Sequence, residues 1–216
     1  AQPGRTIMGA EQRQWLFDRL DTAQQSDVVW KLIGNQVMIT PWRLVDLEEP
    51  VLRQIFPDMP NHNGVYLNMD SWDSYMRERD DLFAHLADRN IQNVAALTGD
   101  VHMFFQSSMH ADFDDEKSPV VINEFTGGSI SSPAINAIRN DDISIALEGV
   151  FKNFNPRYSY CDFRRNGYGV VEATTDAMTV SYRATRAWWK NQPVRTSVKF
   201  HMEAGNPQAQ LEKIRP

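Results

Sequence analysis

The sequence predicts an α/β fold, and three observations support this class. Apolar residues recur at three- and four-residue steps over residues 9–23 and 74–89, which is typical of amphipathic helices. Short apolar runs at residues 28–33 and 93–98 follow these helices, and each run ends at a glycine, as a buried strand does at a loop. The order of helix and then strand is that of an α/β layer, and 216 residues with 42% hydrophobic content suffice for one large core.

Composition argues against a nucleic-acid partner, a transmembrane segment and an intrachain disulfide. The net charge of −6 argues against a nucleic-acid partner, because phosphate backbones require a basic face. No apolar run approaches the ~20 residues that a transmembrane helix needs, so we expect no transmembrane segment. Cys161 is the only cysteine, which excludes an intrachain disulfide, and we expect it to be a packed strand residue.

Between the two helices, residues 40–70 hold four prolines, and we expect a long excursion over the surface. After residue 98 we expect strands at residues 103–105 and 120–122. A turn-rich break at residues 127–133 and a partly helical stretch at residues 134–153 should follow them.

The last third of the chain predicts antiparallel strands. We expect strands at residues 158–163, 168–174 and 178–184, with hairpin turns at residues 165–167 and 175–177. Apolar and polar residues alternate over residues 198–202, as in a half-buried strand. We therefore expect one domain over residues 1–204 and a polar, loosely held tail over residues 205–216.

The tetrapeptide Gly99-Asp100-Val101-His102 is the strongest functional signal in the chain. It follows an apolar run, and the strand ends of α/β sheets are where binding sites form. In an extended loop the side chains of Asp100 and His102 would point the same way, and a carboxylate with an imidazole can bind a metal ion. The alternative is that both side chains cap a turn and hydrogen-bond locally.

Several separated segments, in this order, resemble the PhoD-like alkaline phosphatase and phospholipase D branch of the calcineurin-type metallophosphoesterases. The matching segments lie at residues 8–16, 30–37, 70–75 with Arg79, 97–102, 124–125 with 129–132, and 160–162 with Gly167 and Tyr168. The resemblance covers most of residues 5–185.

The resemblance implies a fold and a metal centre. The fold is a four-layer α/β/β/α sandwich with two metal ions at the carboxyl ends of the central strands. Gly99-Asp100-Val101-His102 matches the last metal-binding motif of that fold, with Asp100 in place of the first histidine of other branches. Because a carboxylate is a harder ligand than an imidazole, Ca²⁺ and Fe³⁺ are favoured, with Zn²⁺ or Mn²⁺ as the other candidates.

The earlier metal motifs of the family have no match in this sequence, so the chain resembles the C-terminal half of such an enzyme. The implied partner is the N-terminal half, as a separate chain or a missing segment. The implied activity is hydrolysis of phosphomonoesters or phosphodiesters, including the phospholipase D type, and the implied location is extracellular or periplasmic. The alternative is a non-catalytic fragment or binding domain with an incomplete metal site.

The same resemblance suggests roles for six further residues. Asn35 and Gln36 end a strand where related branches place a metal-binding histidine, so an amide oxygen would bind the metal or, alternatively, satisfy backbone groups. Asp73 would assist catalysis by bonding a metal ligand or water, or would simply cap the helix that follows. Substrate-binding roles are expected for Trp72, Tyr75 and Arg79, with Arg79 gripping a phosphate.

The remaining polar candidates carry weaker signals. His62 and His110 lie in loop-like context and could approach a site, whereas His85 reads as a surface residue and His201 as the polar side of a strand. The serines of the break at residues 127–133 would bind a phosphate or, by the reading we prefer, cap an ordinary turn.

Overall fold

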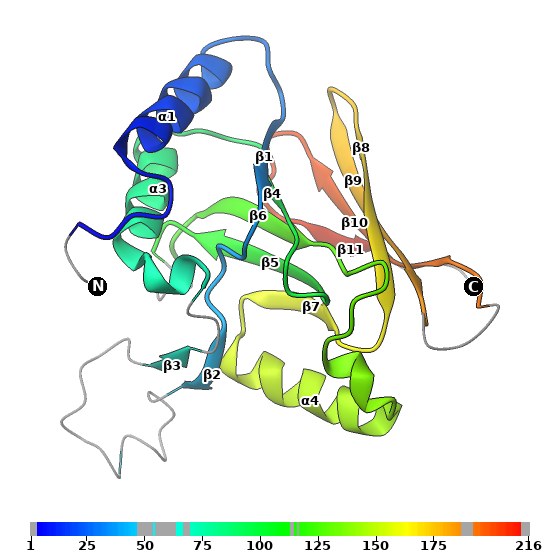
Figure 1. Cartoon of the computed structure of the whole chain (residues 1–216). Helices are drawn as coiled ribbons and strands as arrows, with labels where there is room; N and C mark the ends of the chain where they lie inside the picture. The colour runs from blue at the N-terminus through cyan, green and yellow to red at the C-terminus, as the bar shows by residue number, and fades with distance from the viewer. Residues whose placement is uncertain are drawn as a thin grey trace.

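A computed structural model describes residues 4–46, 54, 64–66, 70–112, 115, 117–186 and 192–212 of the chain (Figure 1). Its helices are α1 (Ala10–Gln24), α3 (Met76–Asp88) and α4 (Asp141–Phe154), with short 3₁₀ turns η1 (Trp72–Ser74) and η2 (Ile135–Ile138). The described strands form two larger sheets and one small pair. The α/β class predicted from the sequence is confirmed.

The central sheet has five strands in the order β1-β4-β6-β5-β7. Strands β1 (Lys31–Asn35), β4 (Val94–Thr98) and β6 (Val120–Thr126) run parallel to one another. Strands β5 (Phe104–His110) and β7 (Tyr158–Asp162) complete the sheet in antiparallel pairing. The sheet is therefore mixed, and its parallel half begins with β1 at one edge.

The second sheet is antiparallel, in the order β11-β10-β9-β8. It is formed by β8 (Asn166–Ala173), β9 (Ala177–Thr185), β10 (Arg195–Glu203) and β11 (Gln210–Glu212). In β10 the alternating residues Val198, Phe200 and Met202 are buried, as the sequence pattern predicted. A two-stranded pair, β2 (Arg43–Asp46) with β3 (Gly64–Tyr66), lies apart from both sheets.

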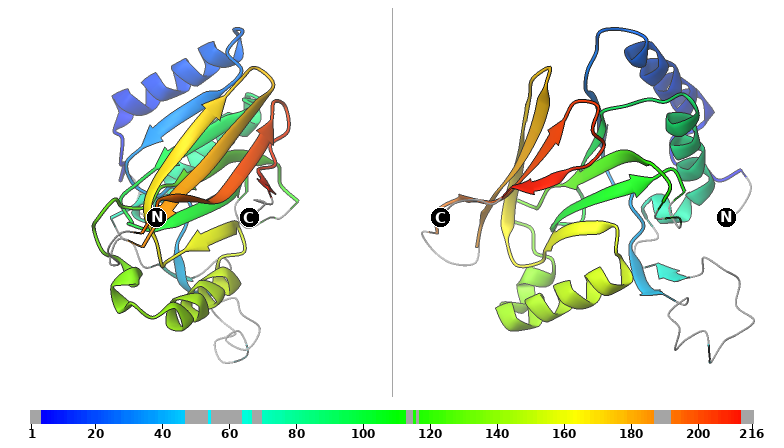
Figure 2. Two further views of the ribbon diagram at one scale, coloured as in Figure 1. Left: turned by 90° about the vertical axis from the view of Figure 1, so that its right-hand side faces the viewer. Right: turned by 180° about the vertical axis from the view of Figure 1, so that it is seen from behind.

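Three layers follow from how these elements pack (Figure 2). Helices α1 and α3 cover one face of the central sheet, where Leu82, Phe83 and Leu86 pack against Ala96 and Ile122. The other face packs on the second sheet through Phe104 and Phe125, which meet Tyr182 and Phe200. Helix α4 packs under β7 and β5, with Phe151 against Phe105 and Tyr158.

Helix α4 shows how local sequence starts an element. The side chain of Asn140 accepts hydrogen bonds from the backbone N–H groups of Asp142 and Ile143, which have no partners within the helix. Asp141 and Asp142 place negative charge in the first turn, where the helix dipole favours it. The helix then runs to Phe154 and buries Phe151 against the central sheet.

Four sequence-based expectations need correction. The first strand lies at Lys31–Asn35, three residues later than its starting point at residue 28. The excursion expected from residue 40 begins with Thr40, Pro41 and Trp42 buried. The hairpin turn expected at residues 165–167 is wrong, because β7 and β8 belong to different sheets and β8 begins at Asn166. The tail expected to be loosely held pairs with β10 through β11.

Candidate functional site

Three parallel strands of the central sheet end side by side. In the strand register Asn35 of β1 lies opposite Thr98 of β4, and Thr98 lies opposite Thr126 of β6. The carboxyl ends of parallel strands form one edge of a sheet, where α/β proteins place their ligands. Asn35, Gln36 and the tetrapeptide of residues 99–102 are therefore brought to the same edge, as the sequence predicted.

The backbone of the tetrapeptide is strained. Asp100 has a φ of 76° and His102 a φ of 60°, which is the left-handed region that residues with a Cβ atom avoid. The backbone N–H of Val101 donates to the carbonyl of Gly99 at 3.0 Å, so the chain turns sharply after the strand. Asn90 and Asn93 also have positive φ, so the strain at Asp100 and His102 supports a site only together with their position at the strand ends.

His102 is held by one ring nitrogen. Its Nδ1 lies 3.1 Å from the carbonyl oxygen of Pro133. Because a carbonyl oxygen only accepts, Nδ1 carries the proton in this contact, and the Nδ1–H tautomer of imidazole has its lone pair on Nε2. This is the arrangement of a histidine whose second nitrogen is free to bind a metal ion. The side chain of Asp100 is exposed at the same edge.

Asn35 and Gln36 follow the same strand end but differ in their surroundings. The amide nitrogen of Asn35 donates to the carbonyl of Val37 and contacts Thr98 Oγ1 at 3.3 Å, so its oxygen Oδ1 remains for another partner. Gln36 is exposed. Both residues line a cavity of about 280 Å³ together with Trp72, whose ring is buried. The structure thus places Trp72 and the two amides in the lining of one cavity.

The structure buries Asp73 and Arg79 instead of presenting them to a ligand. Asp73 Oδ1 lies 2.9 Å from Arg79 Nη1, and its second oxygen accepts the backbone N–H of Trp42 at 3.0 Å. Burial raises the pKa of Asp73 above its usual value, against the opposing effect of the Arg79 charge. Arg79 also donates to the carbonyl of Ile39. These contacts correct the expected phosphate grip of Arg79, because its charge already neutralises a buried carboxylate.

Tyr75 lies between η1 and α3 and is partly buried. The Arg5 guanidinium sits 5.0 Å from the centre of its ring, a cation–π contact. Tyr75 therefore packs against the N-terminal segment. Its expected role in binding substrate stays a prediction.

Glu124 is a residue of this edge to which the sequence analysis assigned no role. It is fully buried in β6 and accepts three hydrogen bonds, from the backbone N–H groups of Ile39 and Thr40 and from Thr98 Oγ1. It joins the end of β4 to the segment that follows β1. The sequence signal that could have found it is a charged residue within the predicted strand region of residues 120–126.

The serines after β6 act as turn caps, the reading preferred from the sequence. Ser129 Oγ accepts the backbone N–H groups of Ser131 and Ser132. Of the histidines, His85 corrects our expectation of a surface residue, because its ring stacks on Phe17 at 4.1 Å. His110 is the last residue of β5 and contacts the carbonyl of Ser118. Because β5 runs antiparallel to β6, this end of β5 lies away from the carboxyl ends of the parallel strands. His201 is partly exposed on β10, and His62 lies outside the described residues.

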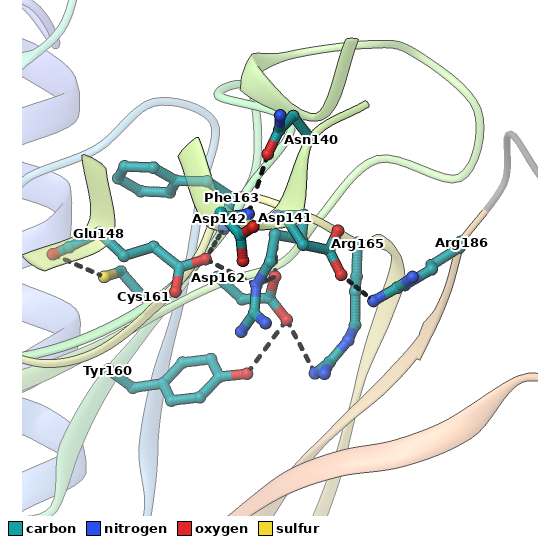
Figure 3. Close-up of polar contacts among 11 residues, drawn as sticks. Asn140, Asp141, Asp142, Glu148, Tyr160, Cys161, Asp162, Phe163, Arg165 and Arg186 are labelled. Carbon is teal, nitrogen blue, oxygen red and sulfur yellow. Dashed lines mark hydrogen bonds and ion pairs between the residues drawn. The ribbon is translucent and has the colours of Figure 1, made fainter. Parts of the chain in front are cut away.

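A buried acid joins the central sheet to the second sheet (Figure 3). Asp162, at the end of β7, lies 3.0 Å from Arg165 Nη1 and accepts the backbone N–H of Arg164. Glu148 of α4 binds the Arg164 guanidinium at 3.0 Å. The neighbouring Cys161 is buried, and burial raises the pKa of its thiol to about 12, so it is an inert packed residue as predicted.

The donor set at the strand ends fits part of a site for a hard metal ion. Asp100 offers a carboxylate and Asn35 an amide oxygen, which are ligand types that Ca²⁺ accepts. His102 offers Nε2, and imidazole nitrogen is a ligand type of iron. Across the part of the chain that the structure describes, no group of three or more His, Cys, Asp or Glu side chains is gathered to hold a metal. A complete site would need ligands from outside these residues.

Comparisons with known proteins agree with this architecture. A solved structure of PhoD matches with a TM-score of 0.74 at 22% sequence identity, covering 99% of this chain and 37% of the solved one. The fold is therefore shared. In the residues with described positions, no helix has the length and apolar character needed to cross a membrane.

Sequence comparison identifies the family. Alkaline phosphatase D of Bacillus subtilis (strain 168) is 30% identical over 181 residues, covering 84% of this chain and 27% of that enzyme. The chain thus spans well under half the length of both relatives. The family model of the PhoD-like phosphatases matches residues 1–182, and the chain belongs to this family.

Proposed function

We propose that the protein containing this chain hydrolyses phosphate esters with a bound metal ion, and that Asp100 and His102 hold that ion. One observation carries the proposal: His102 donates from Nδ1 to Pro133 and keeps Nε2 free at the carboxyl edge of the parallel strands. The strained backbone at Asp100 and His102 and membership of the PhoD-like phosphatases support it.

The metal we favour is Ca²⁺ or Fe³⁺, with Mn²⁺ or Zn²⁺ as the other candidates, because the available donors include a carboxylate and an amide oxygen. When bound, such an ion would neutralise charge on the phosphoryl oxygens and lower the pKa of a bound water. In this proposal Asp100 and His102 hold the ion, and Asn35 or Gln36 supplies an amide oxygen beside it. Trp72 closes the neighbouring cavity.

We further propose that an N-terminal half, as part of the same polypeptide or as a separate chain, completes the site. The chain covers 27% of alkaline phosphatase D, and the described residues supply too few acidic and imidazole ligands for a two-metal centre. The outer face of the second sheet carries no helix within the described residues, and Tyr168 is 44% exposed there. A further helical layer on that face would make the four-layer sandwich, and export from the cell fits a relative of alkaline phosphatase D.

The experiment compares metal content and activity in the natural protein that contains residues 1–216. Metal is measured by elemental analysis, and hydrolysis of p-nitrophenyl phosphate and bis-p-nitrophenyl phosphate separates monoesterase from diesterase activity. We expect chelation to abolish hydrolysis. We expect Asp100→Ala and His102→Ala to lower kcat/KM at least 100-fold and to reduce bound metal.

Asp27→Ala and His201→Ala are the matched controls, because both side chains lie away from the strand ends and reach solvent. Full activity after complete metal removal, or in Asp100→Ala, would refute the proposal. A folded protein with neither metal nor hydrolysis would instead identify the chain as a binding domain that kept the fold of the family.

A further inference from the structure

The loop between β6 and η2 links His102 to the first residue of β8. His102 Nδ1 contacts the carbonyl oxygen of Pro133, and the adjacent carbonyl, that of Ser132, accepts the side-chain amide of Asn166 at 3.0 Å. Two consecutive carbonyl groups are therefore hydrogen-bonded by different side chains, that of Ser132 by Asn166 and that of Pro133 by His102. The two carbonyls belong to adjacent planar peptide units, so only the φ and ψ of Pro133 set the angle between them.

Three further hydrogen bonds hold the same loop. The backbone N–H of Gly167 donates to the carbonyl of Ser129 at 2.8 Å. Ser129 Oγ in turn accepts the N–H groups of Ser131 and Ser132. The ring of Pro133 fixes its φ, so ψ of Pro133 is the one remaining rotation between the two carbonyls. The start of β8 thus holds the loop at both Ser129 and Ser132.

Asn166 itself is firmly placed. It is fully buried and pairs with Thr185 across β8 and β9. The Arg165 guanidinium before it is bound by Asp162, as Figure 3 shows. The Gly167 backbone after it has a φ of 150° and packs so closely on β9 that a Cβ atom there would lie 1.9 Å from the Arg183 carbonyl oxygen. A rigid amide therefore faces the loop.

We propose that Asn166 is a positioning residue for His102. By holding the Ser132 carbonyl, it aims the Pro133 carbonyl at Nδ1 and so keeps the proton on Nδ1 and the lone pair on Nε2. As a statement about the imidazole tautomer the inference needs no metal. As a statement about metal affinity it rests on the proposed function.

The test reads the tautomer directly, in the absence of metal. The sample carries ¹⁵N-labelled histidine and is held at about pH 9, where free imidazole is neutral and its protonated and unprotonated ring nitrogens have well-separated ¹⁵N shifts. The His102 signals are assigned with His102→Gln. We expect the parent protein to hold His102 as the Nδ1–H tautomer, and Asn166→Ala to lower the population of that tautomer at least twofold.

Two further variants keep the test decisive. Asn166→Leu removes the amide donor and keeps a side chain of similar size, so it tests the same contact even if Asn166→Ala does not fold. Asn153→Ala, on the exposed side of α4, is the control and should leave the tautomer unchanged. Folded Asn166→Ala or Asn166→Leu protein with the tautomer of the parent would overturn the inference.

Metal binding is the second readout, with Mn²⁺ alone as the probe in the natural protein. We expect Asn166→Ala to weaken Mn²⁺ binding about 10-fold, the size of effect typical of groups that orient a metal ligand. A tautomer that depends on Asn166 in a protein without metal-dependent hydrolysis would support the positioning role and refute the proposed function. A tautomer that is unchanged in Asn166→Ala, in a protein with metal-dependent hydrolysis, would support the proposed function and refute the positioning role.

Discussion

Asp73 and Arg79 form an ion pair of 2.9 Å in the interior of the protein, where their side chains are 1% and 4% exposed. The pair joins η1 to α3 and binds the backbone of Ile39 and Trp42. It therefore holds the segment after β1 against the helices. An ion pair exposed to water contributes little to stability. In the interior each charge needs the other, because an unpaired buried charge is strongly destabilising.

Removing one partner of this ion pair should destabilise the folded protein. We expect Arg79→Met to lower the free energy of unfolding by about 3–5 kcal/mol, because Asp73 is left charged and buried. Arg77→Met, at an exposed position two residues earlier, should change it by less than about 0.5 kcal/mol. Urea unfolding of both variants measures the difference, and equal losses would contradict the role assigned to the pair.

The pH dependence of stability reports on Asp73 separately. Its pKa is raised in the folded state, so between 3.8 and that raised value the folded protein binds more protons than the unfolded chain. The contribution of Asp73 is therefore fully present below pH 3.8 and is lost as pH rises through the folded pKa. Subtracting the stability profile of Asp73→Asn from that of the parent should leave a difference that falls across this window. A flat or rising difference would show that burial does not dominate at Asp73.

Glu124 should matter through its hydrogen bonds. Glu124→Ala leaves the N–H groups of Ile39 and Thr40 and the hydroxyl of Thr98 without their acceptor, and we expect a loss of about 3 kcal/mol or more. Glu124→Gln retains one oxygen and should lose less. Chemical denaturation orders the variants, and a Gln variant as unstable as the Ala variant would mean that the negative charge, and not the acceptor count, is what matters.

Two glycines offer a matched pair. Gly167→Ala would place a Cβ atom against the Arg183 carbonyl, so we expect a loss of about 3 kcal/mol or a failure to fold. Gly149→Ala, in α4 with open space around it, should raise stability by about 1 kcal/mol, because alanine favours the helix. Thermal unfolding checks both. A neutral Gly167→Ala variant would mean that β8 and β9 can separate without cost.

The strained turn at the strand end predicts a conflict between stability and activity. Asp100→Gly should raise the free energy of unfolding by about 0.5–1 kcal/mol, because glycine accepts a φ of 76° without a steric penalty. Asp100→Asn, which tolerates the same backbone, should leave stability unchanged. Both variants should lose hydrolysis. Stability is read from denaturant midpoints, and destabilisation by the glycine would show that the Asp100 carboxylate has a structural partner.

Sequence periodicity determined the parts of this fold that depend on neighbours in the chain. Helices α1 and α3, the strand that ends before Gly99 and the alternation in β10 were all predicted, because burying one face of a helix or strand imposes a regular spacing. The placement of Asp100 and His102 at a strand end was predicted for the same reason. The end of an apolar run at a glycine can be seen in the sequence without knowledge of the tertiary structure.

Only the tertiary structure decided which polar side chains face inward. Arg79 was expected to bind a phosphate and Asn166 to lie in a hairpin turn, yet both are buried against segments distant in the sequence. The partner of His102 is a backbone carbonyl 31 residues away, which leaves no trace in side-chain pattern. Hydrogen-bond partners of buried groups depend on how layers pack, and that packing is not encoded in any single stretch of the chain.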